Sequence, residues 1–198
     1  MEGDRLGRAL AAIDAANADD PHRIVIRGVE QPKELGHAQL ATEWLHRLCP
    51  EPSEALVLAV RAHHLRRWAI DRASYPAGRA GYLKWRTALK QLHAEEVGRI
   101  LVDLGYDETT VARVRDIVRK RGLGTDPEVQ LLEDVVCLVF LETQLHDLAE
   151  KLAPDHVVEV VRKTLPKMSE AAKRVALTLD LAPDDRAVLV RAVGETAA

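Results

Sequence analysis

The chain has 198 residues, of which 47% are hydrophobic and 30% are charged, and its formal net charge is −3. This composition predicts a single globular domain over residues 1–198, with residues 155–198 as a C-terminal helical extension. The acidic balance disfavours a general nucleic-acid coat protein, which would be basic overall. The chain shows neither the apolar core of a secretion signal nor an apolar run long enough to cross a bilayer. Two cysteines make no disulfide framework, so we expect a soluble cytoplasmic protein without a membrane partner.

Helical spacing of apolar residues dominates the first third of the chain. Residues 18–32 interrupt it and are expected to be mainly a connector, in which Arg23–Ile26 could form a short extended piece. Ser53 is placed to cap a helix that continues to about Trp68. The predicted helices in this part are 4–17, 32–48 and 53–68.

The remainder of the chain is also predicted to be helical. Gly105 is a plausible end of a long helix, Asp107 caps the next one, and Pro166 interrupts a later one. No pair of strands joined by typical hairpin turn residues is evident. The predicted helices are 79–104, 108–121, 126–151, 155–180 and 183–194. The sequence therefore predicts an all-α fold, a bundle of about 7–9 helices.

One stretch, Arg61–Lys90, concentrates cationic and aromatic side chains. It holds eight basic residues against one acid, together with four of the six Trp and Tyr residues. Guanidinium groups bind phosphate and carboxylate, and aromatic faces stack on planar groups. We therefore expect this stretch to bind a small anionic, phosphorylated ligand rather than nucleic acid, although a solvated helix face is the alternative. The candidate binding residues are Arg66, Arg67, Arg79, Tyr82, Lys84 and Arg86.

Metal-ligating side chains occur in otherwise apolar segments at His37, His63, His64 and Asp134. A carboxylate in the position of Asp134 is costly to bury unless it is paired or coordinated. Neutral imidazoles with a carboxylate suit one divalent transition metal, such as Zn, Mn, Fe, Co or Ni. Two alternatives stay open. Asp134 could form a buried salt bridge with an arginine, and one of the adjacent histidines could be a packed residue instead of a ligand.

The order His, His-His, Asp on three helices resembles the HD-domain metal-dependent phosphohydrolase superfamily. There a helical His, a His-Asp pair and a late Asp bind a metal. The resemblance implies an HD-like helical bundle that hydrolyses a phosphate ester of a small or nucleotide-like substrate. His93 resembles an additional His of dinuclear members, and Glu133, beside Asp134, is a candidate base. His64 stands where the superfamily has Asp, so we expect one metal rather than two.

A second resemblance covers nearly the whole chain. The segments that carry it are PKELGHAQL, RAHHLRRW, YPAGRAGYLKWRTALK, GLGTDPEVQ and EDVVCLVFLETQL. They are similar to an uncharacterised family catalogued as a domain of unknown function, some members of which carry a glutamyl-tRNA synthetase label. The sequence lacks the nucleotide-binding α/β pattern that this label requires.

Two other functions stay open beside hydrolysis. One is a non-catalytic HD-like module that binds a nucleotide, RNA or another anion through the stretch Arg61–Lys90. The other is an HD-like iron oxygenase, against which the missing His-Asp carboxylate counts.

Overall fold

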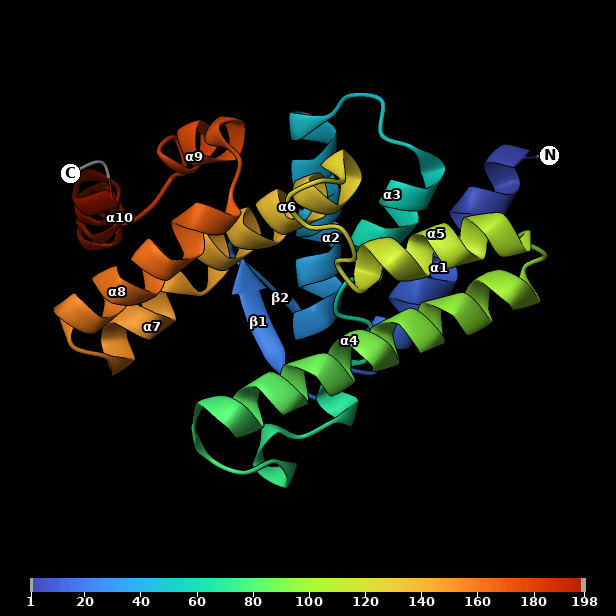
Figure 1. Cartoon of the computed structure of the whole chain (residues 1–198), viewed down its shortest axis with the longest axis horizontal. Helices are drawn as coiled ribbons and strands as arrows, with labels where there is room; N and C mark the ends of the chain where they lie inside the picture. Colours follow the sequence, from blue (N-terminus) through green and yellow to red (C-terminus); the bar gives the residue numbers. More distant parts are fainter. Residues whose placement is uncertain (1, 197–198) are drawn as a thin grey trace. The chain divides into compact units, whose positions relative to one another are not determined.

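The computed structural model describes the backbone of residues 2–196 and the side chains of residues 5–194. The chain divides into two compact units, Met1–Leu132 and Glu133–Ala198, and each has its own buried core. The boundary falls inside one helix, α6 (Figure 1). Among the described residues, no helix is both long and apolar enough to cross a membrane.

The first unit is helical apart from one small hairpin (Figure 1). Short 3-10 turns lie between α3 and α4, at Arg67–Ala69 and Arg72–Ser74. The elements of this unit, in chain order, are α1 (Glu2–Ala18), β1 (Arg23–Ile26), β2 (Val29–Pro32), α2 (Lys33–Leu48), α3 (Glu54–Arg61), α4 (Gly78–Asp103), α5 (Glu108–Val118) and the start of α6 (Pro127–Thr143).

The second unit is helical throughout its described residues. Its α8 packs against α7 and α10, with Val157, Val161 and Leu189 buried. A 3-10 turn at Leu165–Lys167 follows α8, which confirms the predicted interruption at Pro166. The elements after α6 are α7 (Leu145–Lys151), α8 (Pro154–Thr164), α9 (Glu170–Ala176) and α10 (Pro183–Thr196).

The hairpin shows that the all-α prediction was wrong for residues 23–32. Strands β1 and β2 pair antiparallel, and the pair Ile26 and Val29 closes the turn. Its two central residues, Arg27 and Gly28, have φ angles of 49° and 80°. Positive φ at both positions is typical of a type I′ turn, which usually carries Asn-Gly or Asp-Gly. Because arginine occupies the first position, the turn chemistry was not recognised.

The third helix is shorter than predicted. It ends at Arg61 rather than near Trp68, and a turn follows it over residues 62–66. In this turn Arg66 has a φ angle of 53°, and its backbone N–H donates to Asn17 Oδ1 at 3.1 Å. His63 and His64 therefore lie in a turn and not on a helix.

Another predicted helix is divided in two, and the predicted helix 108–121 ends earlier, at Val118. The predicted helix 126–151 is divided at Gln144 into α6 and α7. No proline or glycine marks this break in the sequence.

The helix caps predicted from the sequence are confirmed. Ser53 Oγ accepts a hydrogen bond from the Leu56 N–H at 3.1 Å, and Asp107 Oδ1 accepts one from the Thr110 N–H at 2.9 Å. Gly105 ends α4 with a φ angle of 76°, a conformation that favours glycine. These local signals explain why the starts of α3 and α5 and the end of α4 were predicted to within about two residues.

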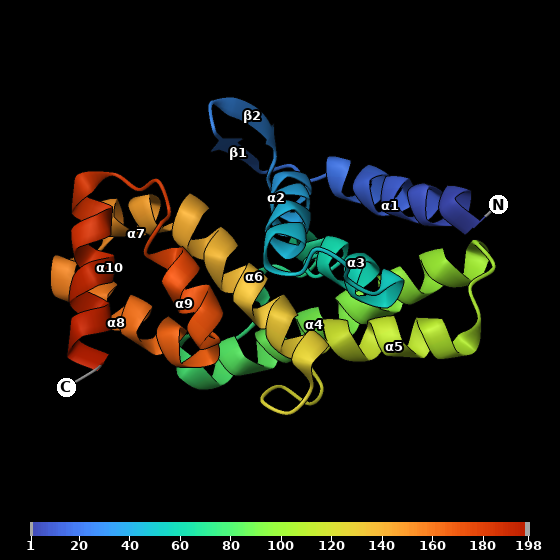
Figure 2. The same cartoon turned by 90° about the horizontal axis from the view of Figure 1, so that it is seen from above.

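The core of the first unit forms where its helices cross (Figure 2). Helix α4 packs along α5, while α3 packs on α2 and α5, and α1 packs on α2, α3 and α4. Leu45, Leu58, Leu101 and Ile117 are fully buried in these contacts. Burial of such apolar side chains is the main stabilising contribution of the unit.

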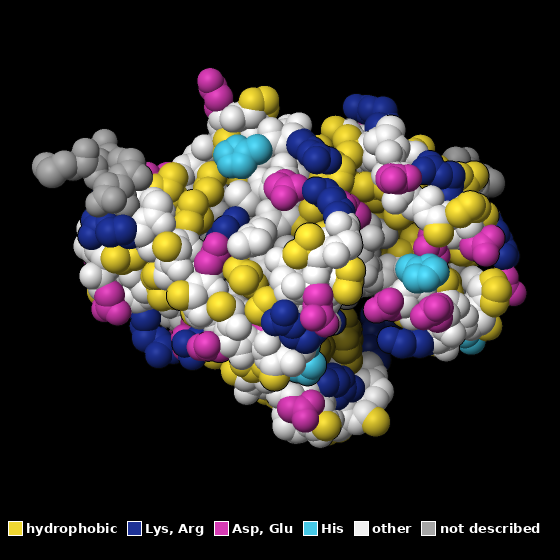
Figure 3. Space-filling view, turned by 180° about the vertical axis from the view of Figure 1, so that it is seen from behind, with side chains coloured by type: hydrophobic (Ala, Val, Ile, Leu, Met, Phe, Trp, Pro, Cys, Tyr) yellow, Lys and Arg dark blue, Asp and Glu magenta, His cyan; other side chains and the backbone are white. Residues whose placement is uncertain are grey.

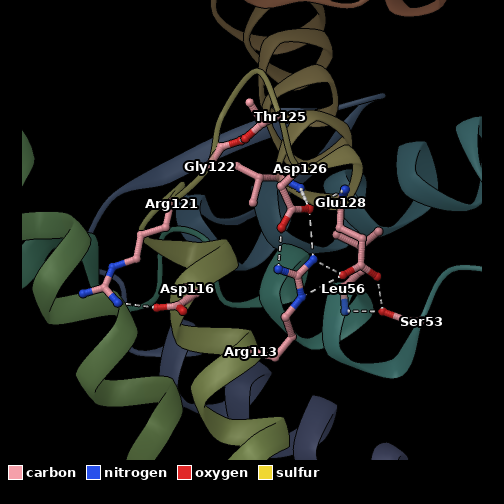
Figure 4. A network of polar contacts seen from close by, with 10 residues as sticks. Ser53, Leu56, Arg113, Asp116, Arg121, Gly122, Thr125, Asp126 and Glu128 are labelled. Carbon is pink, nitrogen blue, oxygen red and sulfur yellow. Dashed lines mark hydrogen bonds and ion pairs between the residues drawn. The ribbon is translucent and has the colours of Figure 1, made fainter.

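A cluster of charged groups joins α5 to the start of α6 (Figure 4). The Arg113 guanidinium donates to both oxygens of Asp126 at 2.5 and 2.9 Å, and also to Glu128. Glu128 in turn accepts a hydrogen bond from the Ser53 hydroxyl, which caps α3. The Arg113 guanidinium holds the pKa of Asp126 at about 2. The arrangement ties the starts of α3 and α6 to one arginine of α5.

Candidate metal centre

Glu34, His37 and His64 form a group that could hold a metal ion. One ligand atom from each residue lies within 4.8 Å of the other two. Glu34 Oε2 is 3.2 Å from His64 Nδ1 and 3.4 Å from His37 Nδ1. Glu34 and His37 are buried and His64 is partly buried. The structure therefore brings together two of the four predicted ligands, and it adds a carboxylate that was not predicted.

The base of the hairpin positions the start of α2. Glu34 and His37 are three residues apart and share one helix face. The buried Asp20 carboxylate accepts a hydrogen bond from the Glu34 N–H at 2.9 Å, which satisfies an amide at the helix start. At Gly36, a Cβ would lie 2.9 Å from Gln31 and 3.0 Å from Ile26. The absence of a side chain there allows the hairpin to pack closely on the helix.

Two further histidines lie beside this group. His63 Nδ1 is 2.8 Å from the Val60 carbonyl oxygen, and His93 Nδ1 is 2.7 Å from the Leu65 carbonyl oxygen. Both rings are buried, and their centroids are 4.2 and 5.9 Å from that of His64. A carbonyl that accepts from Nδ1–H leaves the Nε2 lone pair available, the arrangement common among metal-binding histidines. The ligand role of His63 and the catalytic role of His93 stay predictions.

The group combines one carboxylate with imidazoles, and two more buried histidines lie beside it. Burial lowers the pKa of His63 to about 3 and the pKa of His93 to about 4. Burial also lowers the pKa of His64 well below its usual value, as do the neighbouring His63 and Arg67. Burial alone would raise the pKa of Glu34, but His64 and His37 outweigh it and hold this pKa well below its usual value. Such a donor set suits a divalent transition metal.

Arg67 reaches the same group from the 3-10 turn after the histidines. Its Nη1 lies 3.3 Å from His64 Nε2, and its Nε lies 3.8 Å from Glu34 Oε1. The guanidinium also sits over the Trp85 ring, 4.9 Å from the centroid. Burial lowers the pKa of Arg67, yet a guanidinium stays charged in proteins. Arg67 thus supplies a cation next to the Glu34 carboxylate.

A cleft of about 370 Å³ opens beside the three candidate ligands. Glu34 and Arg67 belong to its wall, together with Lys33 and the indoles of Trp68 and Trp85. Cations and aromatic faces next to a candidate metal centre can bind a phosphate group and a planar group at once.

Arg72 also lines this cleft, but its guanidinium is engaged by the backbone. It donates to the carbonyl oxygens of Tyr75 at 3.0 Å and of Pro76 at 3.1 Å. These bonds hold the loop between the 3-10 turns and α4, so Arg72 shapes the wall of the cleft.

The other predicted anion-binding residues are not among those that line this cleft, although the Tyr82 ring lies 5.9 Å from that of Trp85. Arg66 approaches Glu96 at 3.9 Å, and Arg86 donates to the Tyr82 hydroxyl at 3.1 Å. Arg79 is exposed at the start of α4. Lys84 lines a separate cavity of about 680 Å³ together with three other cationic side chains, Lys90, Arg119 and Arg121. Among the six candidates, Arg67 is the one that lines the cleft beside Glu34.

Glu133 and Asp134 are buried in α6, in the second unit. Asp134 Oδ1 accepts a hydrogen bond from the Ser169 N–H at 2.7 Å. The Ser169 hydroxyl caps α9, so Asp134 holds the start of that helix. The metal-binding role of Asp134 and the catalytic role of Glu133 stay predictions.

Glu34 is the residue that the sequence analysis missed. The spacing Glu34-Leu35-Gly36-His37 is a Glu-x-x-His pattern, in which both side chains project from one face of a helix. An acidic residue in a first helical turn is commonly solvated and stabilises the helix dipole, so the pattern alone does not indicate a metal ligand.

Charges of both signs occur on the face of the molecule shown in Figure 3. On the face in Figure 3, Lys and Arg side chains are interspersed with Asp and Glu side chains. This mixture agrees with the net charge of −3 and favours a local ligand site over an extended polyanion surface.

A comparison with known protein families identifies the family of this chain. Curated proteins and solved structures give no match. Residues 7–189 match the family described as Domain of unknown function (DUF4202). The match covers most of the chain, and the protein therefore belongs to the DUF4202 family.

Proposed function

We propose that this protein is a metal-dependent hydrolase that acts on a phosphate ester of a small or nucleotide-like anionic substrate. One divalent transition metal would be held by Glu34, His37 and His64. The observation that carries the proposal is that buried Glu34 belongs both to this group and to the wall of a cleft lined by Arg67 and Lys33. The resemblance to HD-domain phosphohydrolases supports the same class of reaction.

The chemistry divides between the metal centre and the cleft. Glu34, His37 and His64 would hold the metal ion, which would supply Lewis-acid activation of water for attack on phosphorus. Lys33 and Arg67 would hold the phosphate oxygens through charge-assisted hydrogen bonds. The indoles of Trp68 and Trp85 would stack on a planar part of the substrate and exclude water. In this scheme Lys33 and Arg67 would position the phosphate group beside Glu34, His37 and His64.

Metal content is the first test of the proposal. Protein purified without a tag or chelator is expected to contain about one equivalent of a transition metal, measured by mass spectrometry. Glu34→Gln is expected to lower this content strongly, because it replaces the anionic ligand with a neutral amide. Glu43→Gln is the matched control, since Glu43 lies on the same helix and pairs with Arg27 at the surface. Retention of the metal in Glu34→Gln would sink the assignment.

Two further measurements separate loss of metal from loss of folding. Thermal unfolding shows whether Glu34→Gln is folded, and His64→Gln tests the partly buried ligand independently. If metal is present, release of inorganic phosphate from a panel of nucleoside monophosphates and sugar phosphates is the activity assay. Hydrolysis that is lost in both variants but retained in Glu43→Gln would support the proposed site.

A second candidate function is a non-catalytic module that binds an anion. The cavity lined by Lys84, Lys90, Arg119 and Arg121 favours it, because no acidic residue lines that cavity. This function predicts binding of a nucleotide that weakens with added salt and needs no metal. Equal binding before and after treatment with a chelator, without any phosphate release, would favour the module over the hydrolase.

A further inference from the structure

We propose that Arg67 and a metal ion compete for His64, so that metal binding releases the Arg67 guanidinium to bind the substrate anion in the cleft. The inference rests on the proposed function and adds a mode of regulation to the same site. It follows from the contacts of one imidazole, His64, and one guanidinium, Arg67.

The hydrogen bonds of His64 fix the position of its proton. Arg67 Nη1 lies 3.3 Å from His64 Nε2, and a guanidinium nitrogen can only donate. Nε2 must therefore be the accepting nitrogen, and the ring proton is on Nδ1. The Nδ1–H then donates to Glu34 Oε2, which is 3.2 Å away. With these two contacts, both nitrogens of a neutral His64 imidazole have hydrogen-bond partners.

A neutral imidazole has one lone pair, and Arg67 already uses it. A metal bound through Nε2 would need that lone pair directly. A metal bound through Nδ1 would move the proton to Nε2, where it would face the N–H of Arg67. Coordination of His64 through either nitrogen is therefore incompatible with the Arg67 hydrogen bond.

The charges at the site also favour separation of Arg67 from the ligands when a metal ion binds. Arg67 Nε lies 3.8 Å from the Glu34 carboxylate, whose side chain is only 5% exposed. The guanidinium thus offsets a buried negative charge, which would otherwise be costly. A divalent cation at the three ligands would replace this function and would also repel the guanidinium. Both effects drive Arg67 away from the ligands.

The cleft offers Arg67 a place to move to. Its guanidinium lies over the Trp85 ring, and the Trp85 indole N–H donates to the Ile70 carbonyl oxygen at 2.9 Å. This bond fixes the indole, so the guanidinium can change position while it stays in contact with the ring face. Arg67, Trp85 and Lys33 all line the same cleft. A released Arg67 would therefore join Lys33 in binding an anion there.

Metal affinity is the first test. Arg67→Met keeps an unbranched side chain against Trp85 but removes the charge and the donors. It is expected to bind Co²⁺ about tenfold more tightly than the wild type, because a competing charge-assisted hydrogen bond is gone. Arg66→Met is the matched control, since Arg66 carries the same charge but approaches Glu96. Its Co²⁺ affinity should change by less than about threefold.

Phosphate affinity is the second test. Binding of inorganic phosphate is measured for the wild type and Arg67→Met, each with and without saturating Co²⁺. Without metal, the two proteins are expected to bind phosphate equally. With metal, Arg67→Met is expected to bind it about tenfold more weakly. This comparison isolates Arg67 from direct contact between the metal and phosphate, because that contact is present in both proteins.

The outcomes separate the inference from the function on which it rests. If Co²⁺ binds to none of the variants, the metal centre is wrong and both proposals are overturned. If Arg67→Met and Arg66→Met bind Co²⁺ with the affinity of the wild type, only the competition is overturned. An equal effect of Arg67→Met on phosphate binding with and without metal would also overturn it. Arg67→Gln repeats both titrations if Arg67→Met does not fold.

Discussion

Gly81 lies buried in the first turn of α4, against the backbone of Pro76. A Cβ at this position would overlap the Pro76 carbonyl oxygen, which Arg72 holds through hydrogen bonds of 3.1 Å. Gly81→Ala is therefore expected to displace the loop and to lower the free energy of unfolding by about 1–3 kcal/mol, as measured with urea. Gly7→Ala in α1 is the control, because a Cβ there meets nothing within 4 Å. It should stabilise the protein by roughly 0.5–1 kcal/mol, and an unchanged Gly81→Ala would contradict the argument.

The buried histidines make stability depend on pH. Burial lowers the pKa of His93 from 6.5 to about 4 in the folded chain. The unfolded chain therefore binds a proton between these two values while the folded chain does not. The contribution of neutral His93 is complete above pH 6.5 and is lost progressively as the pH falls toward 4. Each such histidine can lower the free energy of unfolding by up to about 1.4 kcal/mol per pH unit.

Urea unfolding of the wild type across this pH range measures the effect. His93→Asn is expected to flatten the curve, whereas His46→Asn, at an exposed position, is expected to leave it unchanged. A wild-type curve that is flat between these pH values would refute the buried neutral state of His93.

At the scale of elements, local signals predicted most of the helices and missed the structures that depend on tertiary contacts. Ser53, Asp107 and Gly105 mark helix ends through bonds to nearby residues, so a single sequence is enough to find them. The end of α3 is different, since the left-handed Arg66 is held by Asn17, 49 residues away. The residues around Arg66 do not indicate this hydrogen bond, so the end of α3 at Arg61 could not be predicted from the local sequence.

In the candidate metal centre, too, some residues could be predicted from local sequence and others depend on tertiary contacts. His37 and His64 stood out because they are imidazoles in apolar segments. Glu34 did not, because its role depends on the turn that brings His64 to within 3.2 Å of it. The sequence thus supplied the residue types, and the turn after α3 determined which of them meet.

The cluster around Arg113 predicts a stability effect that belongs to helix ends. Arg113→Ala is expected to lower the free energy of unfolding by about 1–2 kcal/mol, because Asp126 and Glu128 lose their common partner. Arg162→Ala, which breaks a surface pair with Glu159, should change it by less than about 0.5 kcal/mol. Equal effects of the two substitutions in urea unfolding would argue against a special role for the cluster.

The same cluster should be sensitive to acid. Arg113 holds the pKa of Asp126 at about 2, compared with 3.8 for an unperturbed carboxyl. The contribution of this pair is therefore complete above pH 3.8 and is lost as the pH falls toward 2. The destabilisation caused by Arg113→Ala should shrink over that interval in urea titrations. A constant difference from the wild type would contradict the pairing.

At the scale of the whole molecule, the two units can be followed separately because each has its own core. Asp134→Ala removes the acceptor of the Ser169 amide and is expected to speed hydrogen exchange at the start of α9. Asp134→Asn, which keeps an accepting oxygen, is expected to have a smaller effect. Unchanged exchange in α9 in the alanine variant would contradict this role.

The same variant tests the predicted metal-binding role of Asp134. If Asp134 is a ligand, Asp134→Ala must lower the metal content of the purified protein. Full retention of metal, with α9 destabilised, would leave Asp134 as a structural residue of the second unit.

The hairpin before α2 is held at its base by backbone hydrogen bonds, and at its tip Arg27 pairs with Glu43 at the surface. The Lys33 N–H donates to the His22 carbonyl oxygen at 2.9 Å, and Asp20 accepts from the Glu34 N–H. Arg27 and Gly28, at the turn, are exposed. The two ends of a peptide inserted between them would lie close together, and the insertion would not affect the hydrogen bonds at the base of the hairpin. The turn is therefore a suitable position for a fluorescent or affinity tag.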